Sequence, residues 1–177
     1  MFSWFIMRMV ILTPWLGYLC RSDVKYRRLP NVWTLGGFAV GLLVQSAWWG
    51  WTGFKDGVAA AGVAVLFLIL PFLVRAAGAG DVKMLAACGA FIGLRSMPLL
   101  LMAVSFAGLF VALWMLCRRQ VTAARLKHAF RTLFDWRYDR RAGKAALPAK
   151  DDERARVPFG VAIAIGTWAT LIVEACQ

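Results

Sequence analysis

Long apolar runs, separated by short polar segments, dominate the hydrophobic pattern of this chain. Five of the runs are each apolar for about the 20 residues that an α-helix needs to cross about 30 Å of hydrocarbon. A sixth run is shorter and begins with charged residues, but it joins two longer runs and is apolar from Met84 onward. The pattern therefore predicts an all-α fold, a polytopic transmembrane helix bundle of about six spans. The expected spans are residues 2–20, 32–51, 57–76, 81–94, 98–117 and 157–176.

The composition agrees with a membrane protein. Of the 177 residues, 61% are hydrophobic and 17% are charged, against about 25% charged in an ordinary soluble domain. Because no Ser- or Pro-rich linker divides it, the chain is expected to form a single membrane-embedded domain over residues 1–177. Arg8 lies near the middle of the first span and no small-residue cleavage site follows, so we interpret this span as retained rather than as a removed signal peptide. The Arg8 side chain should snorkel or face protein.

The basic residues are divided unequally between the two ends of the expected bundle, and this predicts its orientation. One end receives most of the Lys and Arg residues, whereas the other receives little more than Lys55 and Arg95. Loops rich in Lys and Arg stay in the cytoplasm, so the N-terminus should lie outside and the loops after spans one, three and five inside. The formal net charge of +12 thus indicates membrane topology and a partner surface of anionic lipid, rather than nucleic acid.

Residues 118–156 form the only long polar segment, a basic cytoplasmic loop between spans five and six. Part of it has apolar residues at helical spacing among Arg and Lys, which favours an amphipathic helix at the membrane interface. A solvated basic loop is the alternative. The apolar residues of the pattern are Leu126, Phe130, Leu133 and Phe134.

Motifs for several reaction classes are missing from the sequence. The four cysteines form no CxxC pair, and His128 is the only histidine, so we expect no zinc site and no other metal or cofactor. The chain has no GxSxG, HExxH or P-loop sequence, which argues against serine-hydrolase, zinc-protease and nucleotide chemistry. The remaining candidates for catalysis are carboxylates.

Two carboxylates, Asp23 and Asp81, are expected at the cytoplasmic ends of spans. Two complete crossings separate them, and an even number of crossings returns the chain to the same face. One carboxylate of such a pair can take a proton from water while the other, kept protonated by its neighbour's charge, polarises the carbonyl group under attack. This is the constellation of an aspartyl hydrolase.

Each aspartate also has a purely structural interpretation. Asp81 follows Gly78 and Gly80 in "AGAGDVKMLAA", where the glycines would permit unusual backbone conformations and close approach of a substrate strand. An aspartate that opens a helix can equally be an N-cap. Asp23 could be a loop acid paired to Lys25 or Arg27. The sequence alone leaves both alternatives open.

Three segments resemble the type IV prepilin peptidases, a family of membrane aspartyl peptidases. "GAGDVKMLAACGAFIG" is similar to their GxGD motif and the helix that follows it, and "DVKYRRLPN" is similar to their segment with an aspartate after the first span. "VPFGVAIAIG" is similar to the segment that opens their last span. The three occur in the family's order, and together they cover most of the chain.

The resemblance implies that Asp23 and Asp81 are the catalytic aspartates. Gly78 and Gly80 correspond to the motif glycines, and Lys83 to the lysine that often follows the motif aspartate. The chain lacks the paired CxxC motifs of the larger bifunctional members, which are associated with N-methylation of the new pilin terminus. It therefore resembles the short, peptidase-only branch that serves Tad/Flp-type pili. Residues that match the "R-x-P-N" end of the first motif, and are expected to support structure or substrate, are Arg28, Pro30 and Asn31.

The reaction that this resemblance implies is cleavage of prepilin and pseudopilin precursors at the cytoplasmic face of the bacterial inner membrane. A precursor of this type has a short basic leader followed by an apolar helix, and the family cleaves at the junction, after a glycine. Two other interpretations stay open. One keeps the aspartates but takes archaellin-like precursors or other membrane peptides. The other is a non-catalytic transporter subunit or assembly scaffold, in which Asp23 and Asp81 pair with Lys25 and Lys83.

Overall fold

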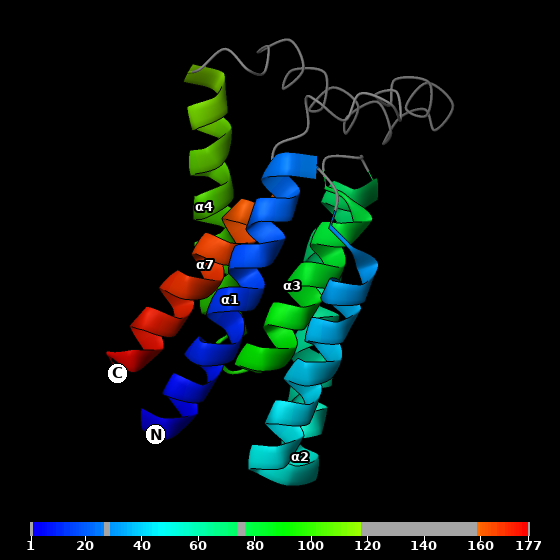
Figure 1. Cartoon of the computed structure of the whole chain (residues 1–177), viewed down its shortest axis with the longest axis vertical. Coiled ribbons are helices and arrows are strands. Elements are labelled where there is room, and N and C mark those ends of the chain that lie inside the picture. The colour runs from blue at the N-terminus through cyan, green and yellow to red at the C-terminus, as the bar shows by residue number, and fades with distance from the viewer. Residues whose placement is uncertain (1, 27–28, 74–76, 118–158, 177) are drawn as a thin grey trace.

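The computed structural model describes residues 2–26, 29–73, 77–117 and 159–176, and every regular element in these ranges is an α-helix. Helix α1 (Phe2–Tyr26) runs from the lower to the upper end of the bundle in Figure 1, and α4 (Met97–Cys117) runs in the same direction. Helices α3 (Ala79–Ile92) and α7 (Phe159–Ala175) run the opposite way, from the upper end to the lower end. The predicted all-α class is confirmed.

Helix α2 (Asn31–Leu73) contains both the second and the third expected span. It consists of two arms that meet at Gly50, whose φ of 62° and ψ of −144° break the helix, and the second arm returns toward the upper end (Figure 1). Residues 52–56, which lie between the two expected spans, are helical as well. A single glycine with positive φ reverses the chain, a conformation that glycine adopts much more readily than other residues because it has no Cβ.

Helix α3 is the centre of the bundle. All nine of its residues from Met84 to Ile92 are buried. Small residues let the second arm of α2 approach it closely, since a Cβ on Gly57 would lie 3.2 Å from the Ala90 carbonyl oxygen and one on Gly89 3.1 Å from that of Ala60. Close contact through small residues is typical of helix pairs in membranes.

A buried ion pair joins α1 and α7 near the chain termini. Arg8 Nη2 lies 2.6 Å from Glu174 Oε2, and the Arg8 guanidinium also lies over the Trp4 ring, 5.1 Å from its centroid. With 5% of its surface exposed, Arg8 faces protein, one of the two positions expected for it. The cost of placing a cation in this span is offset by its carboxylate partner.

Two of the described helices are long and apolar enough to cross a membrane, namely α2 and residues 97–114 of α4. Helix α7 is a shorter apolar helix. Large apolar side chains are exposed along the outside of both longer helices, among them Leu43, Leu66 and Phe110. Such a surface suits contact with lipid better than contact with water. The basic segment 118–156, with His128 and the pattern from Leu126 to Phe134, lies outside the described residues.

Candidate active site

Asp23 lies in the last turns of α1, at the upper end of the bundle, and its carboxylate meets the beginning of α7. It is 7% exposed, and its Oδ2 atom accepts a hydrogen bond of 3.0 Å from the backbone N–H of Gly160. The first N–H groups of a helix have no partner within the helix and carry a partial positive charge. The start of α7 therefore both satisfies and fixes a buried carboxylate.

Gly160 makes this contact possible because it has no side chain. A Cβ at this position would lie 2.7 Å from Asp23 Oδ2 and 3.1 Å from its Cγ. Cys20, one turn before Asp23, has its sulfur 3.9 Å from the Gly160 carbonyl oxygen. The segments containing Asp23 and Gly160, 137 residues apart in sequence, are thus in direct contact.

Asp81 lies in the first turn of α3, at the same end of the bundle, but it does not open the helix. The helix begins at Ala79 with Gly78 as its N-cap, and Asp81 is the third helical residue. Asp81 Oδ2 accepts a hydrogen bond of 2.8 Å from the Gly78 N–H, which is the return half of a capping box. The prediction that Asp81 starts the helix is wrong by two residues, because the cap is made through the backbone of Gly78.

The two motif glycines do not have the role expected from the sequence. Gly78 has φ −86° and ψ 159°, ordinary extended values, and Gly80 is not among the positive-φ glycines of the described chain. A Cβ on Gly80 would lie 2.8 Å from Leu29 Cβ, and one on Gly78 would lie 3.3 Å from Asp81 Oδ2. The expected conformational role is therefore wrong, and the space beside Gly80 is filled by Leu29 rather than open to a substrate strand.

Lys83 connects the two aspartate-bearing segments. Its Nζ donates a hydrogen bond of 2.8 Å to the side-chain oxygen of Asn31, the first residue of α2. Pro30 precedes this helix, and its carbonyl oxygen accepts from the N–H groups of Trp33 and Thr34. The Lys83–Asn31 hydrogen bond thus connects the start of α2 to α3, and Pro30 caps the first turn of α2. Arg28, the remaining candidate of this motif, lies outside the described residues.

Within the described ranges, Lys25 and Lys83 have contacts other than ion pairs. Lys25 Nζ lies over the Tyr26 ring, 5.0 Å from its centroid, and Lys83 donates to the Asn31 side-chain oxygen. Arg8 and Glu174 form an ion pair. In the same described ranges, no group of three or more His, Cys, Asp or Glu residues is placed to hold a metal ion.

Sequence reasoning overlooked one further contact of α7. Cys88 of α3 lies next to Thr167 of α7, while the Thr167 hydroxyl donates a hydrogen bond of 2.7 Å to the Ile163 carbonyl oxygen within α7. A polar threonine in an apolar run was the only signal in the sequence. The Cys88–Thr167 contact indicates the register between the helix that carries Asp81 and the helix that binds Asp23.

Comparison with known proteins identifies the family of the segments that carry the two aspartates. The model of the type IV leader peptidase family matches residues 10–113, more than half of the 177 residues and a range that includes both aspartates. The chain is also 33% identical over 125 residues to a prepilin leader peptidase/N-methyltransferase of Pectobacterium carotovorum subsp. carotovorum. This alignment covers 66% of the chain but 44% of the relative, so the chain spans less than half of the relative's length. No solved structure matches. The family match confirms the resemblance seen in the sequence, and this chain belongs to the type IV leader peptidase family.

Proposed function

We propose that the chain is a membrane aspartyl endopeptidase that removes the short basic leader from type IV prepilin-like precursors. In this proposal Asp23 and Asp81 act as a pair on the peptide bond at the junction between leader and apolar helix. Water is the nucleophile. One carboxylate takes a proton from the water while the other, protonated, donates a hydrogen bond to the carbonyl oxygen, and the proton taken up then reaches the departing amine.

The observation that supports the pairing is the register between α3 and α7. Asp81 precedes Cys88 by seven residues, and Gly160 precedes Thr167 by seven residues. Seven residues are nearly two turns, about 10 Å along the axis, so each pair lies on one face of its helix. The two helices run in the same direction (Figure 1). The Cys88–Thr167 contact therefore predicts that Asp81 is level with Gly160, the residue that binds Asp23.

An angle between the axes of α3 and α7 changes the expected level of Asp81 relative to Gly160 only slightly. Neighbouring helices in membranes commonly cross at about 20°, which displaces two points by about 4 Å over a length of about 10 Å. A shift of this size is compatible with the proposed meeting of the Asp81 and Asp23 carboxyl groups, directly or through one water molecule. The start of α7 then serves as the common support of both groups.

We further propose six membrane crossings, with the arms of α2 as the second and third, the N-terminus outside, and the aspartates at the cytoplasmic face of the bacterial inner membrane. The basic residues support this orientation, because Arg21 and Lys25 in α1 share the aspartates' end of the bundle, where α4 ends and α7 begins. The basic sequence 118–156 lies between these two helices in the chain. Loops rich in Lys and Arg remain in the cytoplasm, so this end of the bundle is proposed to face it. Anionic lipid at the basic loop follows from the same charges.

The substrates in this proposal are Tad/Flp-type prepilins and pseudopilins, and the reaction is peptide cleavage without methyl transfer. The four cysteines, at positions 20, 88, 117 and 176, include no CxxC pair, and four residues join α1 to α2. This supports the peptidase-only branch, although the relative's name includes N-methyltransferase. We propose no metal ion or nucleotide in the reaction.

The direct test is cleavage by the purified full chain in a bilayer. The substrate is an Flp-type precursor with its basic leader and apolar helix, and mass spectrometry identifies the product termini. We expect a single cut at the junction after a glycine, at the same rate with and without a metal chelator, and no methylated terminus when a methyl donor is present. An intact precursor would refute the proposed substrate class, and loss of cleavage with chelator would refute the metal-free reaction.

A further inference from the structure

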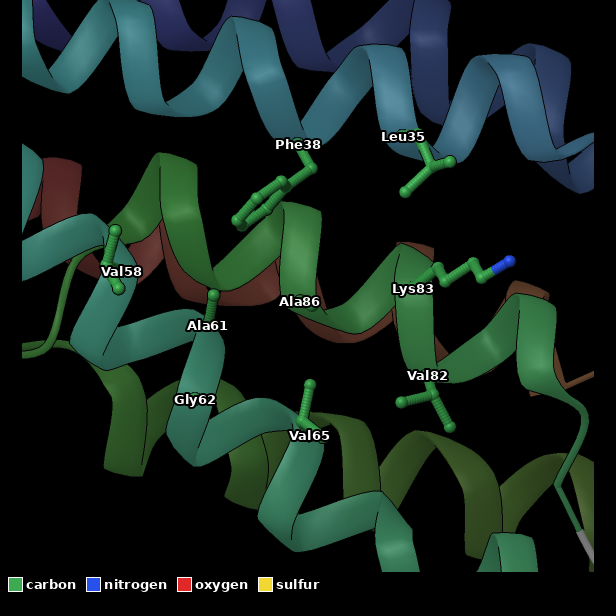
Figure 2. Close-up of a pocket in the computed structure, with 9 residues that line it drawn as sticks. All are labelled: Leu35, Phe38, Val58, Ala61, Gly62, Val65, Val82, Lys83 and Ala86. Atoms are coloured by element: carbon green, nitrogen blue, oxygen red, sulfur yellow. The ribbon is translucent and has the colours of Figure 1, made fainter.

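A groove of about 310 Å³ is lined by residues of both arms of α2 and of α3, which lies between the arms (Figure 2). It is on the side of α3 away from Asp81, since Ala86 and Lys83 are about 140° and 200° around the helix from Asp81 at 100° per residue. Lys83 is the one lining residue that it shares with the candidate active site. Its lining consists of Leu35, Phe38, Val58, Ala61, Gly62, Val65, Val82, Lys83 and Ala86.

Lys83 is the only charged residue in this lining. Its side chain extends toward the end of the groove where α3 begins, and its nitrogen points away from Ala86 and Phe38 (Figure 2). An ammonium group has three donors, of which one binds Asn31 Oδ1. Among the described residues Lys83 has no carboxylate partner. Within the described ranges, the groove therefore ends at a cation that takes part in no ion pair.

The lining of the groove decides which kind of group can fill it. It extends from Val58 to Val65, which is about 10 Å along a helix. Every lining residue is apolar or glycine except Lys83, which stands at one end. A hydrocarbon chain with an anionic headgroup matches both the apolar length and the terminal cation.

We propose that this groove binds an anionic phospholipid of the cytoplasmic leaflet. One acyl chain lies between the arms of α2, and the phosphate binds the two remaining donors of Lys83. The cytoplasmic leaflet is rich in anionic lipid, and basic positions between helices on that side are where such headgroups bind. The site uses the proposed orientation of the bundle but not the proposed reaction, so it can fail or succeed independently of peptidase activity.

Gly62 provides a variant that blocks the groove without disturbing the helix. A Cβ at Gly62 meets no atom within 4 Å, and its φ is helical. The same holds for Gly36, which is exposed on the other arm of α2 and does not line the groove. Leucine is a better helix former than glycine, so neither change should disturb α2. The Gly62→Leu side chain fills the groove, and Gly36→Leu is the matched control outside it.

The experiment is native mass spectrometry of the full chain released from detergent micelles, titrated with phosphatidylglycerol or phosphatidylcholine. We expect one phosphatidylglycerol retained with about fivefold preference over phosphatidylcholine, as for one cation at a membrane surface. Gly62→Leu should weaken retention of both lipids at least tenfold, and Gly36→Leu should leave it unchanged. Lys83→Gln should remove the preference between the two headgroups, and Lys83→Arg should restore it. Circular dichroism checks that each variant is folded.

Three outcomes would overturn the proposal. The first is equal lipid retention by Gly62→Leu and Gly36→Leu. The second is displacement of the lipid by glycerol 3-phosphate alone, because a phosphate site would then exist without the chain-binding groove. The third is unchanged lipid retention but weaker binding of a precursor peptide to Gly62→Leu, which would assign the groove to the substrate.

Discussion

Lys83 Nζ and Asn31 Oδ1 are joined by a hydrogen bond of 2.8 Å, although 52 residues separate them in sequence. The contact connects the start of α2 to the helix that carries Asp81. It gives the lysine and the asparagine of the two motifs a shared structural role. Since the bond is exposed, its contribution to stability should be modest, about 1 kcal/mol.

Asn31→Leu removes the acceptor for Lys83 and should loosen residues 29–31 from α3. We expect cleavage to fall severalfold while the melting temperature changes by only a few degrees. Asn31→Asp keeps an acceptor and adds an attractive charge, so it should retain activity. Rates and melting curves of both variants, measured in the same detergent, test this. Equal rates for the Leu and Asp variants would show that the contact is irrelevant to the site.

Gly160→Ala places a methyl group 2.7 Å from the present position of Asp23 Oδ2, so the carboxylate or the start of α7 must move. A displacement of this size at a catalytic group can cost about 100-fold in rate. We expect at least a tenfold loss of cleavage with the protein still folded. Gly36→Ala, at a position where a Cβ meets nothing within 4 Å, is the control. A Gly160→Ala protein as active as Gly36→Ala would show that this contact does not position Asp23.

Gly80 and Leu29 form a packing pair that can be tested by a double-mutant cycle. Gly80→Ala brings a Cβ to 2.8 Å from Leu29 Cβ, and overpacking of this kind typically costs about 1–3 kcal/mol. Leu29→Ala keeps a Cβ at position 29 but removes the rest of the side chain. Residue 29 can then move away from the added methyl group at position 80. We therefore expect the double variant to be more stable than the sum of the two single changes predicts. Simple additivity of the melting-temperature changes would contradict the packing account.

The sequence was sufficient for the helices but not for their contacts. Apolar runs located α3, α4 and α7 within two residues at each end, whereas α1 continues six residues beyond the expected span and two expected spans form α2. The expected reversal between the second and third spans was placed a few residues too late because Thr52, Lys55 and Asp56 are polar, whereas these residues belong to the helix that follows Gly50. Gly160 could not be assigned to Asp23 because that contact depends on how α1 and α7 pack, and no local pattern encodes it. The family resemblance, not periodicity, pointed to that segment.

Labelling of single cysteines tests the proposed orientation. In a background with the four native cysteines replaced by Ala, Lys55→Cys should react with an impermeant maleimide in intact cells. Lys25→Cys and Lys144→Cys should react only after the membrane is opened, since the basic end is expected in the cytoplasm. The first arm of α2 is proposed to cross the membrane once between positions 25 and 55. Labelling of both positions from the same side would exclude this crossing. It would also remove the topological basis for the aspartate pair.

The central claim is that Asp23 and Asp81 act together, and the most direct measurement is the cleavage rate of Asp23→Asn, Asp81→Asn and the double variant. An asparagine oxygen can still accept from Gly160 N–H or Gly78 N–H, so each variant should fold and bind precursor. Because a carboxamide cannot exchange the proton that the reaction needs, each single change should abolish cleavage, and the double variant should be no worse than either one. If Asp81 only caps α3, asparagine should serve almost as well. A folded Asp81→Asn protein that cleaves precursor at nearly the wild-type rate would contradict the account.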